Sequence, residues 1–358
     1  KIKMNGKRRA ASLAAAIGLS CFAGIAISNL YTSSHEPNNN NQAPTLRSYR
    51  RALSNVDHTI LNYNHEHGRM EPVNAATITD AVFKDPKHLY GDCEIPKARF
   101  ATHQVATLYQ PAFPGSGSRM TYELVEALTG MTISNDHNYA IDPNVHNHVV
   151  SVKTHYPNRN GISLEAFDDH FHGALLVIRN PIKAIPSFFN FWYERINHLE
   201  NHSVRAPTEE WIAFRDANLG EQLKSWRKHM DYWLKKYEND RSKLLVLPYE
   251  RLTDNARGPG TALKLAIFLD SVEGVNAAKP EDVACLWHRS VKYMDEGETV
   301  EGHAVRSGSS ATPYTQSQFD AIRNTLQTQK WKYKDDPEVH KIMDQYMRHI
   351  QHSWLYVS

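Results

Sequence analysis

The chain has 358 residues, of which 41% are hydrophobic and 22% charged, and this ordinary composition excludes a mainly disordered, collagenous or polytopic membrane protein. Its 41 basic and 39 acidic residues give a formal net charge of +2, so no overall basic excess points to nucleic acid as a partner. The three cysteines, Cys21, Cys93 and Cys285, are too few for a disulfide-dense module or a four-cysteine zinc site.

The N-terminal segment is typical of a membrane anchor. Residues 10–31 carry no charge and follow the basic residues 7–9. A helix over this range would be about 33 Å long, enough to cross a hydrocarbon core of about 30 Å. The basic flank predicts a cytoplasmic tail over 1–9 and a type II orientation. The polar, Asn-rich range 32–48 is interpreted as a flexible stem. A cleaved secretory signal, which would give a secreted protein, and an organelle transit peptide are the alternatives.

Two features bear on the compartment of the remaining chain. Asn201, followed by His202 and Ser203, forms one glycosylation acceptor pattern, which also occurs by chance. Cys93 and Cys285 would pair in an oxidising compartment, or remain two separate buried thiols.

Buried strand patterns alternate with helical patterns after the stem. Apolar runs predict strands at 105–113, 149–154, 173–178 and 243–249. Apolar residues at intervals of three and four predict helices over 118–129, 182–199, 219–237 and 260–269. A capping box at Thr315 and Gln318 and a start at Asp336-Pro337 predict two later helices. This alternation favours an α/β fold with a central parallel sheet flanked by helices, in which ligands bind at the carboxyl ends of the strands.

The first predicted strand leads into a turn rich in glycine and serine, Pro114-Gly115-Ser116-Gly117-Ser118-Arg119, and then into a helix. Glycines let successive N–H groups converge on one anion, and the helix N-terminus adds positive potential. The Walker A pattern is missing. The turn therefore predicts a phosphate cradle, with an ordinary strand–helix connection as the alternative.

The next two predicted strands also end in polar residues. Lys153 and His155 lie two residues apart, so both point to one side of the strand. They are candidates for a fixed positive charge and a general base. Arg179 follows the third strand and Ser187 lies about two helical turns later, so both could bind one phosphate. A surface histidine and a carboxylate-binding arginine are the alternatives. Together the three strand ends predict a polyanionic ligand.

These segments resemble a known family. FPGSGS before a helix, KTHYP and RNPIKAIPSFFNFWYE are similar to the signature segments of sulfotransferases that use 3′-phosphoadenosine 5′-phosphosulfate. The resemblance covers a motif core of 105–330 within a sulfotransferase domain assigned to 49–358. It implies the P-loop-NTPase-like sulfotransferase fold. The motifs look most like the sulfotransferase domain of the WSC-domain, sialate O-sulfotransferase-like proteins, although three cysteines are too few to build a cysteine-rich WSC module.

The resemblance implies roles residue by residue. Pro114 to Arg119 would bind the 5′-phosphosulfate, and Tyr249 would lie near the adenine. The residues that would bind the 3′-phosphate are Arg179, Ser187, Arg306 and Gly308, the last two from a late Arg-x-Gly loop. His155 would be the general base and Lys153 would assist the leaving phosphate. It also implies in-line transfer without a metal to a glycan or another hydroxyl-bearing acceptor, in a protein of the Golgi membrane with a lumenal domain.

One departure from the family pattern keeps other functions open. Many members have a lysine where this chain has Gly115, so Lys153 or Arg119 would have to offset charge on the bridging oxygen. A nucleotide- or glycan-binding module without catalysis and a nucleotide kinase-like phosphotransferase are the alternatives. Acceptor contacts are expected on loops at 131–148, 156–170 and 286–305. The oligomeric state is not readable from the sequence.

Overall fold

The computed structural model describes residues 61–64, 69–72, 90, 93–200, 203–292 and 314–354. The predicted tail, membrane helix and stem at 1–48 lie outside these ranges. So do the predicted site residues Arg306 and Gly308 and the predicted glycosylation site Asn201. Within the described ranges, no helix is both long and apolar enough to cross a bilayer.

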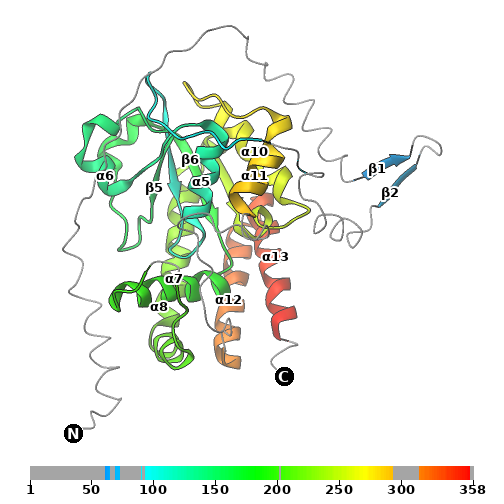
Figure 1. The fold of residues 1–358 in the computed structure, drawn as a ribbon. Coiled ribbons are helices and arrows are strands. Elements are labelled where there is room, and N and C mark those ends of the chain that lie inside the picture. The colour runs from blue at the N-terminus through cyan, green and yellow to red at the C-terminus, as the bar shows by residue number, and fades with distance from the viewer. Residues whose placement is uncertain are drawn as a thin grey trace. The chain divides into compact units, whose positions relative to one another are not determined.

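A five-stranded sheet lies at the centre of this part of the chain (Figure 1), with the strand order β4-β5-β3-β6-β7 and every pairing parallel. The strands are β3 (Thr107–Pro111), β4 (Ser134–Asn135), β5 (Ser151–Thr154), β6 (Phe171–Ile178) and β7 (Leu244–Pro248). The four predicted strands are confirmed, with ends that differ by a few residues. The edge strand β4 has only two residues and carries no readable periodicity. A separate antiparallel pair joins β1 (Leu61–Asn64) to β2 (Arg69–Pro72).

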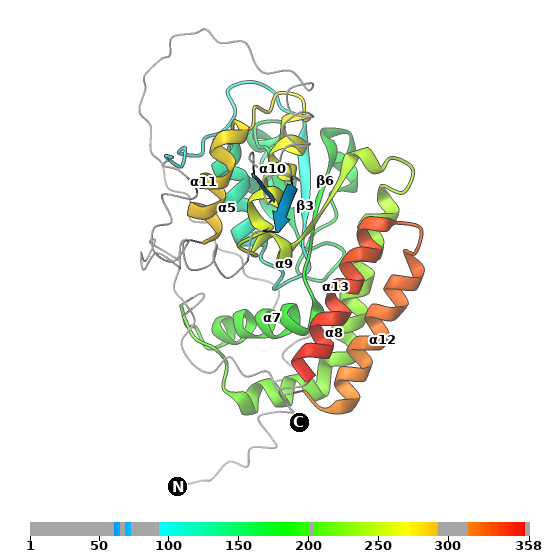
Figure 2. The same ribbon diagram turned by 90° about the vertical axis from the view of Figure 1, so that its right-hand side faces the viewer.

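Helices cover both faces of the sheet (Figure 2). One layer contains α5 (Ser118–Thr129), α10 (Gly258–Asp270) and α11 (Pro280–Val291). The other contains α7 (Pro181–Ile196), α8 (Thr208–Lys236), α12 (Gln316–Lys332) and α13 (Pro337–Trp354). The short helices are α6 (Asp136–Ile141), α9 (Tyr249–Leu252) and the 3-10 turns at Pro143–Val145, Glu165–His170 and Arg241–Lys243.

Alternation along β6 explains this layering. Leu175 and Val177 pack in the core under α5, α10 and α11, whereas Leu176 and Ile178 pack in the core under α7, α8, α12 and α13. Successive side chains of a strand point to opposite faces, so a strand that is apolar at every position requires cover on both sides. The predicted α/β class is confirmed for this reason.

Several predicted boundaries change. Helix α8 begins at Thr208, well before the predicted start at 219, and Glu209 and Glu210 stabilise its first turn. The ranges 131–148 and 286–305, predicted as loops, contain β4 and α6 in the first case and the end of α11 in the second. The predicted capping box of α12 is present at Thr315 and Gln318.

Cys93 and Cys285 form a disulfide that joins the segment before β3 to α11 across 192 residues of sequence. The sequence left open whether these cysteines pair or remain two separate thiols, and in the structure they are paired. Linking such distant positions restricts the unfolded chain strongly and is expected to stabilise the fold by about 3–5 kcal/mol.

Candidate active site

The loop after β3 depends on two glycines. Gly115 and Gly117 have φ angles of 81° and 82°, in the left-handed region that L side chains rarely adopt. A Cβ atom at Gly115 would lie 2.2 Å from the carbonyl oxygen of Ala184 in α7. One at Gly117 would lie 2.4 Å from the ring of Tyr249. The loop therefore packs directly against α7 and against the first residue after β7.

This loop offers donors to an anion. No backbone hydrogen bond between described residues uses the N–H groups of Gly115, Gly117 or Ser118, which begin or precede the first turn of α5. The Ser116 side chain is fully buried, and its hydroxyl has no partner in the described part of the chain. A buried hydroxyl without a partner is costly. A phosphate or sulfate group at this helix N-terminus would satisfy it.

Arg179 fastens the end of β6 to the same loop. Its Nη1 donates to the carbonyl oxygen of Gly115 at 2.7 Å, and its Cζ lies 4.1 Å from the centroid of the Tyr249 ring. Stacking on an aromatic ring and a fixed hydrogen bond orient the planar guanidinium. Its Nε is buried without a partner among the described residues. The arginine is thus oriented with one donor still available.

Helix α7 begins directly after Arg179. Asn180 caps it by accepting a hydrogen bond from the N–H of Ile182 at 3.2 Å, and Pro181 occupies the first turn. Ser187 is half-buried on this helix and immediately precedes Phe188, whose backbone N–H would lie 2.6 Å from a Cβ at Gly115. The predicted phosphate-binding serine therefore lies on the helix that contacts the loop.

His155 follows β5 and turns toward β3. Its Nδ1 lies 2.7 Å from the carbonyl oxygen of Ala112. A carbonyl only accepts, so Nδ1 carries the proton, and Nε2 of the neutral ring has a free lone pair. Burial, and then the positive charge of Lys153, lower the pKa of His155 to about 4. At neutral pH the side chain is an uncharged acceptor.

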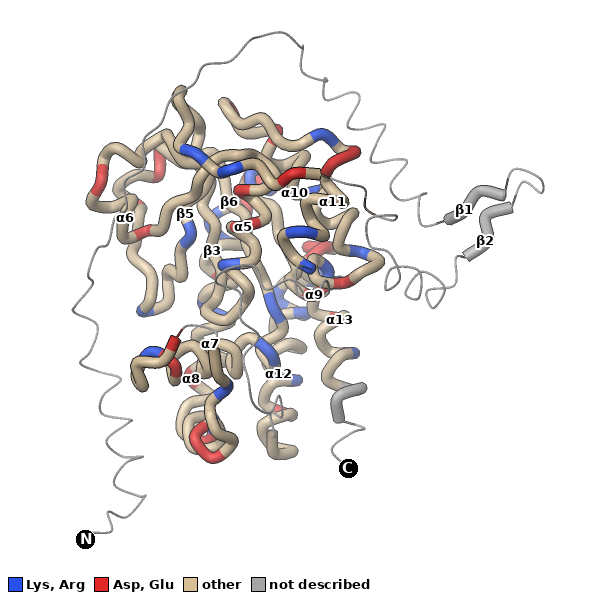
Figure 3. Tube along the Cα trace, in the orientation of Figure 1, with Lys and Arg blue, Asp and Glu red and all other residues tan. Residues whose placement is uncertain are grey.

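Lys153 provides a positive charge on the same strand. Burial lowers its pKa from the usual value, the nearby carboxylate of Asp136 opposes that change, and Arg119 adds to it. Arg119 itself donates through Nε to Glu123 at 2.9 Å. Basic and acidic residues are interspersed along the described chain (Figure 3). The positive character of this site therefore comes from a few well-placed residues.

A family model for the sulfotransferase domain matches residues 111–354. The chain belongs to the sulfotransferase family. No curated protein matches it. Members of this family transfer sulfuryl groups to hydroxyl-bearing acceptors, and the matched range of this sulfotransferase begins at the last residue of β3 and includes every candidate residue described above.

Two carboxylates of the sulfotransferase site were missed by the sequence reading. Asp136 is buried and accepts hydrogen bonds from the Thr154 hydroxyl at 2.6 Å and from the Ile162 N–H at 2.9 Å. Glu250 accepts from the N–H of Asn180 at 2.9 Å and so joins the ends of β6 and β7. The only sequence signal for either is its place beside a predicted strand end or motif. Neither lies in a periodic pattern.

Proposed function

We propose that this sulfotransferase transfers the sulfuryl group of 3′-phosphoadenosine 5′-phosphosulfate to an acceptor hydroxyl, with His155 as general base. One observation carries the proposal: the side chains after β5 and β6 both bond to the segment after β3. His155 contacts the Ala112 carbonyl and Arg179 contacts the Gly115 carbonyl. A base and a phosphate-binding arginine thus lie on either side of one anion cradle.

The donor would bind along the carboxyl edge of the sheet. Residues 114–119 would bind the 5′-phosphosulfate through loop N–H groups and the Ser116 hydroxyl, and Tyr249 would lie near the adenine. Arg179 and Ser187 would bind the 3′-phosphate, together with Arg306 and Gly308 from outside the described ranges. The Ser116 hydroxyl and the Arg179 Nε have no partner among the described residues, and this supports the placement, because the two phosphate groups of the donor would satisfy them.

The proposed transfer is a direct displacement. Nε2 of His155 takes the proton of the acceptor hydroxyl while that oxygen bonds to sulfur. The bond from sulfur to the bridging oxygen breaks, and adenosine 3′,5′-bisphosphate leaves. Alignment of these atoms and stabilisation of the leaving oxygen would supply most of the acceleration. Lys153 would offset the leaving charge. A nearby anion also favours the charged forms of both side chains, so donor binding is expected to raise the pKa of each.

For the acceptor we propose a glycan hydroxyl in the secretory pathway, as the resemblance to the WSC-domain, sialate O-sulfotransferase-like proteins implies. The uncharged stretch at 10–31 favours attachment to the Golgi membrane as a single-pass type II protein with a lumenal catalytic domain. The disulfide between Cys93 and Cys285 supports an oxidising compartment, because such bonds are rare in the cytosol.

A transfer assay tests the proposal. Radiolabelled 3′-phosphoadenosine 5′-phosphosulfate would be incubated with the protein and an array of glycans, and the label on each glycan measured. Replacing the base is expected to lower the rate by about 10²–10⁴-fold in His155→Ala, with donor affinity largely kept. His103→Ala is the control, because His103 lies before the start of β3, where its Nε2 is 2.8 Å from the carbonyl oxygen of Gly274. Equal rates in His155→Ala and wild type would contradict the assigned base.

One observation favours a second candidate, a nucleotide-binding module without catalysis. Gly115 stands where many sulfotransferases have a lysine, and its surroundings exclude a side chain. If the protein binds the donor but labels no glycan on the array, and Lys153→Ala leaves donor affinity unchanged, this second function is favoured.

A further inference from the structure

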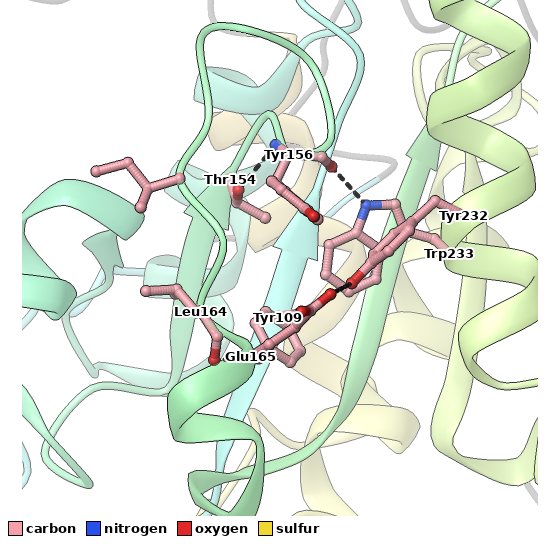
Figure 4. A pocket seen from close by; sticks show the side chains of 8 residues that line it. Tyr109, Thr154, Tyr156, Leu164, Glu165, Tyr232 and Trp233 are labelled. Carbon is pink, nitrogen blue, oxygen red and sulfur yellow. Dashed lines mark hydrogen bonds between the residues drawn. The ribbon is translucent and has the colours of Figure 1, made fainter.

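Helix α8 contacts both halves of the candidate site through side chains that the proposed chemistry does not use. Trp226 is buried and its Nε1 donates to the carbonyl oxygen of Arg179 at 3.0 Å. Two turns later, Trp233 is equally buried and its Nε1 donates to the carbonyl oxygen of Tyr156 at 2.8 Å. Figure 4 shows the second of these bonds. One helix therefore binds the backbone beside the arginine and the backbone beside the base.

A second contact holds the turn after His155. Asn158 Nδ2 lies 3.1 Å from Nδ1 of His229, and the Asn158 Oδ1 accepts from the Ser225 hydroxyl. The amide nitrogen only donates, so Nδ1 of His229 is the acceptor and its proton lies on Nε2. Asn158 in turn donates its N–H to the carbonyl oxygen of His155 at 2.8 Å. The contact thus extends from α8 to the base by two hydrogen bonds.

We propose that the face of α8 formed by Ser225, Trp226, His229 and Trp233 positions His155 and Arg179 for transfer. This inference rests on the proposed function, because it assigns those two residues to base and donor binding. Each contact fixes main chain at or beside Arg179 or His155, so each restricts where the Arg179 or His155 side chain can lie. The face acts in two independent parts, with Trp226 serving donor binding and Trp233 and His229 serving the base.

The helix supplies its own control. Trp211 is also buried on α8, but its Nε1 has no partner among the described residues. A change to phenylalanine removes similar volume at Trp211, Trp226 and Trp233, and removes a hydrogen bond only at the last two. Trp211→Phe therefore reports the cost of lost packing alone, and thermal unfolding of the three variants would show that each is folded.

Two measurements that need no acceptor distinguish the part of this face that serves donor binding from the part that serves the base. Calorimetric titration with adenosine 3′,5′-bisphosphate measures donor binding, and NMR titration of the His155 ring measures its protonation. Relative to Trp211→Phe, Trp226→Phe is expected to weaken bisphosphate binding by about threefold to tenfold, the effect of one hydrogen bond. It should leave the His155 midpoint near the wild-type value.

Trp233→Phe is expected to change the His155 midpoint and to leave bisphosphate binding unaffected. A loosened turn admits water to His155, so its titration midpoint should rise from about 4 toward the ordinary value of about 6.5. The groups that face this ring are Lys153 from β5, Asp136 from α6 and His229 from α8, and none of them changes in this variant. Bisphosphate affinity should match that of Trp211→Phe.

A conservative pair tests His229 in the same way. His229→Asn keeps an amide oxygen near the Nδ1 position and is expected to keep the wild-type midpoint, whereas His229→Leu should raise it. The proposal is overturned if Trp226→Phe binds the bisphosphate as Trp211→Phe does, or if Trp233→Phe and His229→Leu leave the midpoint unchanged. It is also overturned if every variant loses both properties together. Failure of the wild-type protein to bind the bisphosphate would instead overturn the donor assignment itself.

Discussion

The two segments that meet at the candidate site are fixed by different means. The loop after β3, residues 112–117, takes its shape from two left-handed glycines packed against neighbouring backbone and a ring. The turn after β5, residues 155–162, is held by side chains from elsewhere in the sequence, chiefly Asp136, His229 and Trp233. The first segment is therefore intolerant of any side chain added to it, while the second is sensitive to distant substitutions.

The largest effect is expected from restoring the family's lysine. Gly115→Lys forces a left-handed φ on a lysine and places its Cβ against the Ala184 carbonyl. The strain alone costs about 1–3 kcal/mol, and relieving the clash must move the loop. We expect bisphosphate affinity to fall more than a hundredfold in a calorimetric titration.

Gly220 in α8 provides the matched control for that substitution. It is exposed, and an added Cβ would meet nothing within 4 Å. Gly220→Ala is expected to stabilise the protein by about 0.5–1 kcal/mol with unchanged affinity. A Gly115→Lys variant that binds the bisphosphate as well as wild type would show that the loop is not fixed by its backbone.

Removing the disulfide separates global stability from site geometry. A Cys93→Ala/Cys285→Ala variant is expected to lose about 3–5 kcal/mol of unfolding free energy in denaturant titrations. The bond joins the segment before β3 to α11, and neither of these is one of the two segments of the site, so bisphosphate affinity should not change. Dithiothreitol should destabilise wild type and leave the double variant unaffected. A parallel loss of affinity would mean that the site depends on overall stability.

Substitution of Asp136 should change both the stability of the turn after β5 and the pKa values of the residues beside it. Thr154 and Ile162 donate to one oxygen of Asp136, and the N–H of His137 donates to the other at 3.0 Å. In Asp136→Asn the amide oxygen can serve only one of these two positions, so the amide NH2 group faces a donor at the other, at a cost of about 1–3 kcal/mol. Loss of the carboxylate also removes a charge that raises the pKa of Lys153 and His155, so both values should fall further. Chemical denaturation and NMR titration measure the two effects.

Asp142→Asn is the control for Asp136, because asparagine caps as well as aspartate at the turn that Asp142 begins. It should change stability by only a few tenths of a kcal/mol. Similar losses in the two variants would contradict a specific role for the buried carboxylate.

The effect that is smallest near neutral pH concerns acid stability. Burial lowers the pKa of His229 to about 3, below the value of about 6.5 for an unfolded histidine. Between these values the unfolded chain binds a proton that the folded chain does not, so stability falls as pH falls, by about 1.4 kcal/mol per pH unit. His229→Asn should reduce the slope of unfolding free energy against pH by that amount. An unchanged slope would mean that residues other than His229 cause the loss of stability at low pH.

The same contrast explains what the sequence could predict. Gly115, Gly117, Lys153, His155 and Arg179 are adjacent to strand ends, and strand ends are readable from apolar runs, so their meeting at one edge was predictable. Contacts of Asp136, His229 and Trp233 with the turn depend on how helices pack across the sheet. Trp233 lies in the periodic pattern that indicated only a core helix at α8, and Asp136 follows β4, which was too short for any pattern.

The most direct test of the donor site is a calorimetric titration without added metal. Adenosine 3′,5′-bisphosphate and ATP would be titrated separately into wild type, Arg179→Ala and Lys243→Ala, the last removing an exposed positive charge at the opposite end of the sheet. The proposal predicts tight bisphosphate binding, weak ATP binding, and a clear loss in Arg179→Ala that Lys243→Ala does not share. Binding of ATP as tight as that of the bisphosphate, or binding that survives the loss of Arg179, would contradict it.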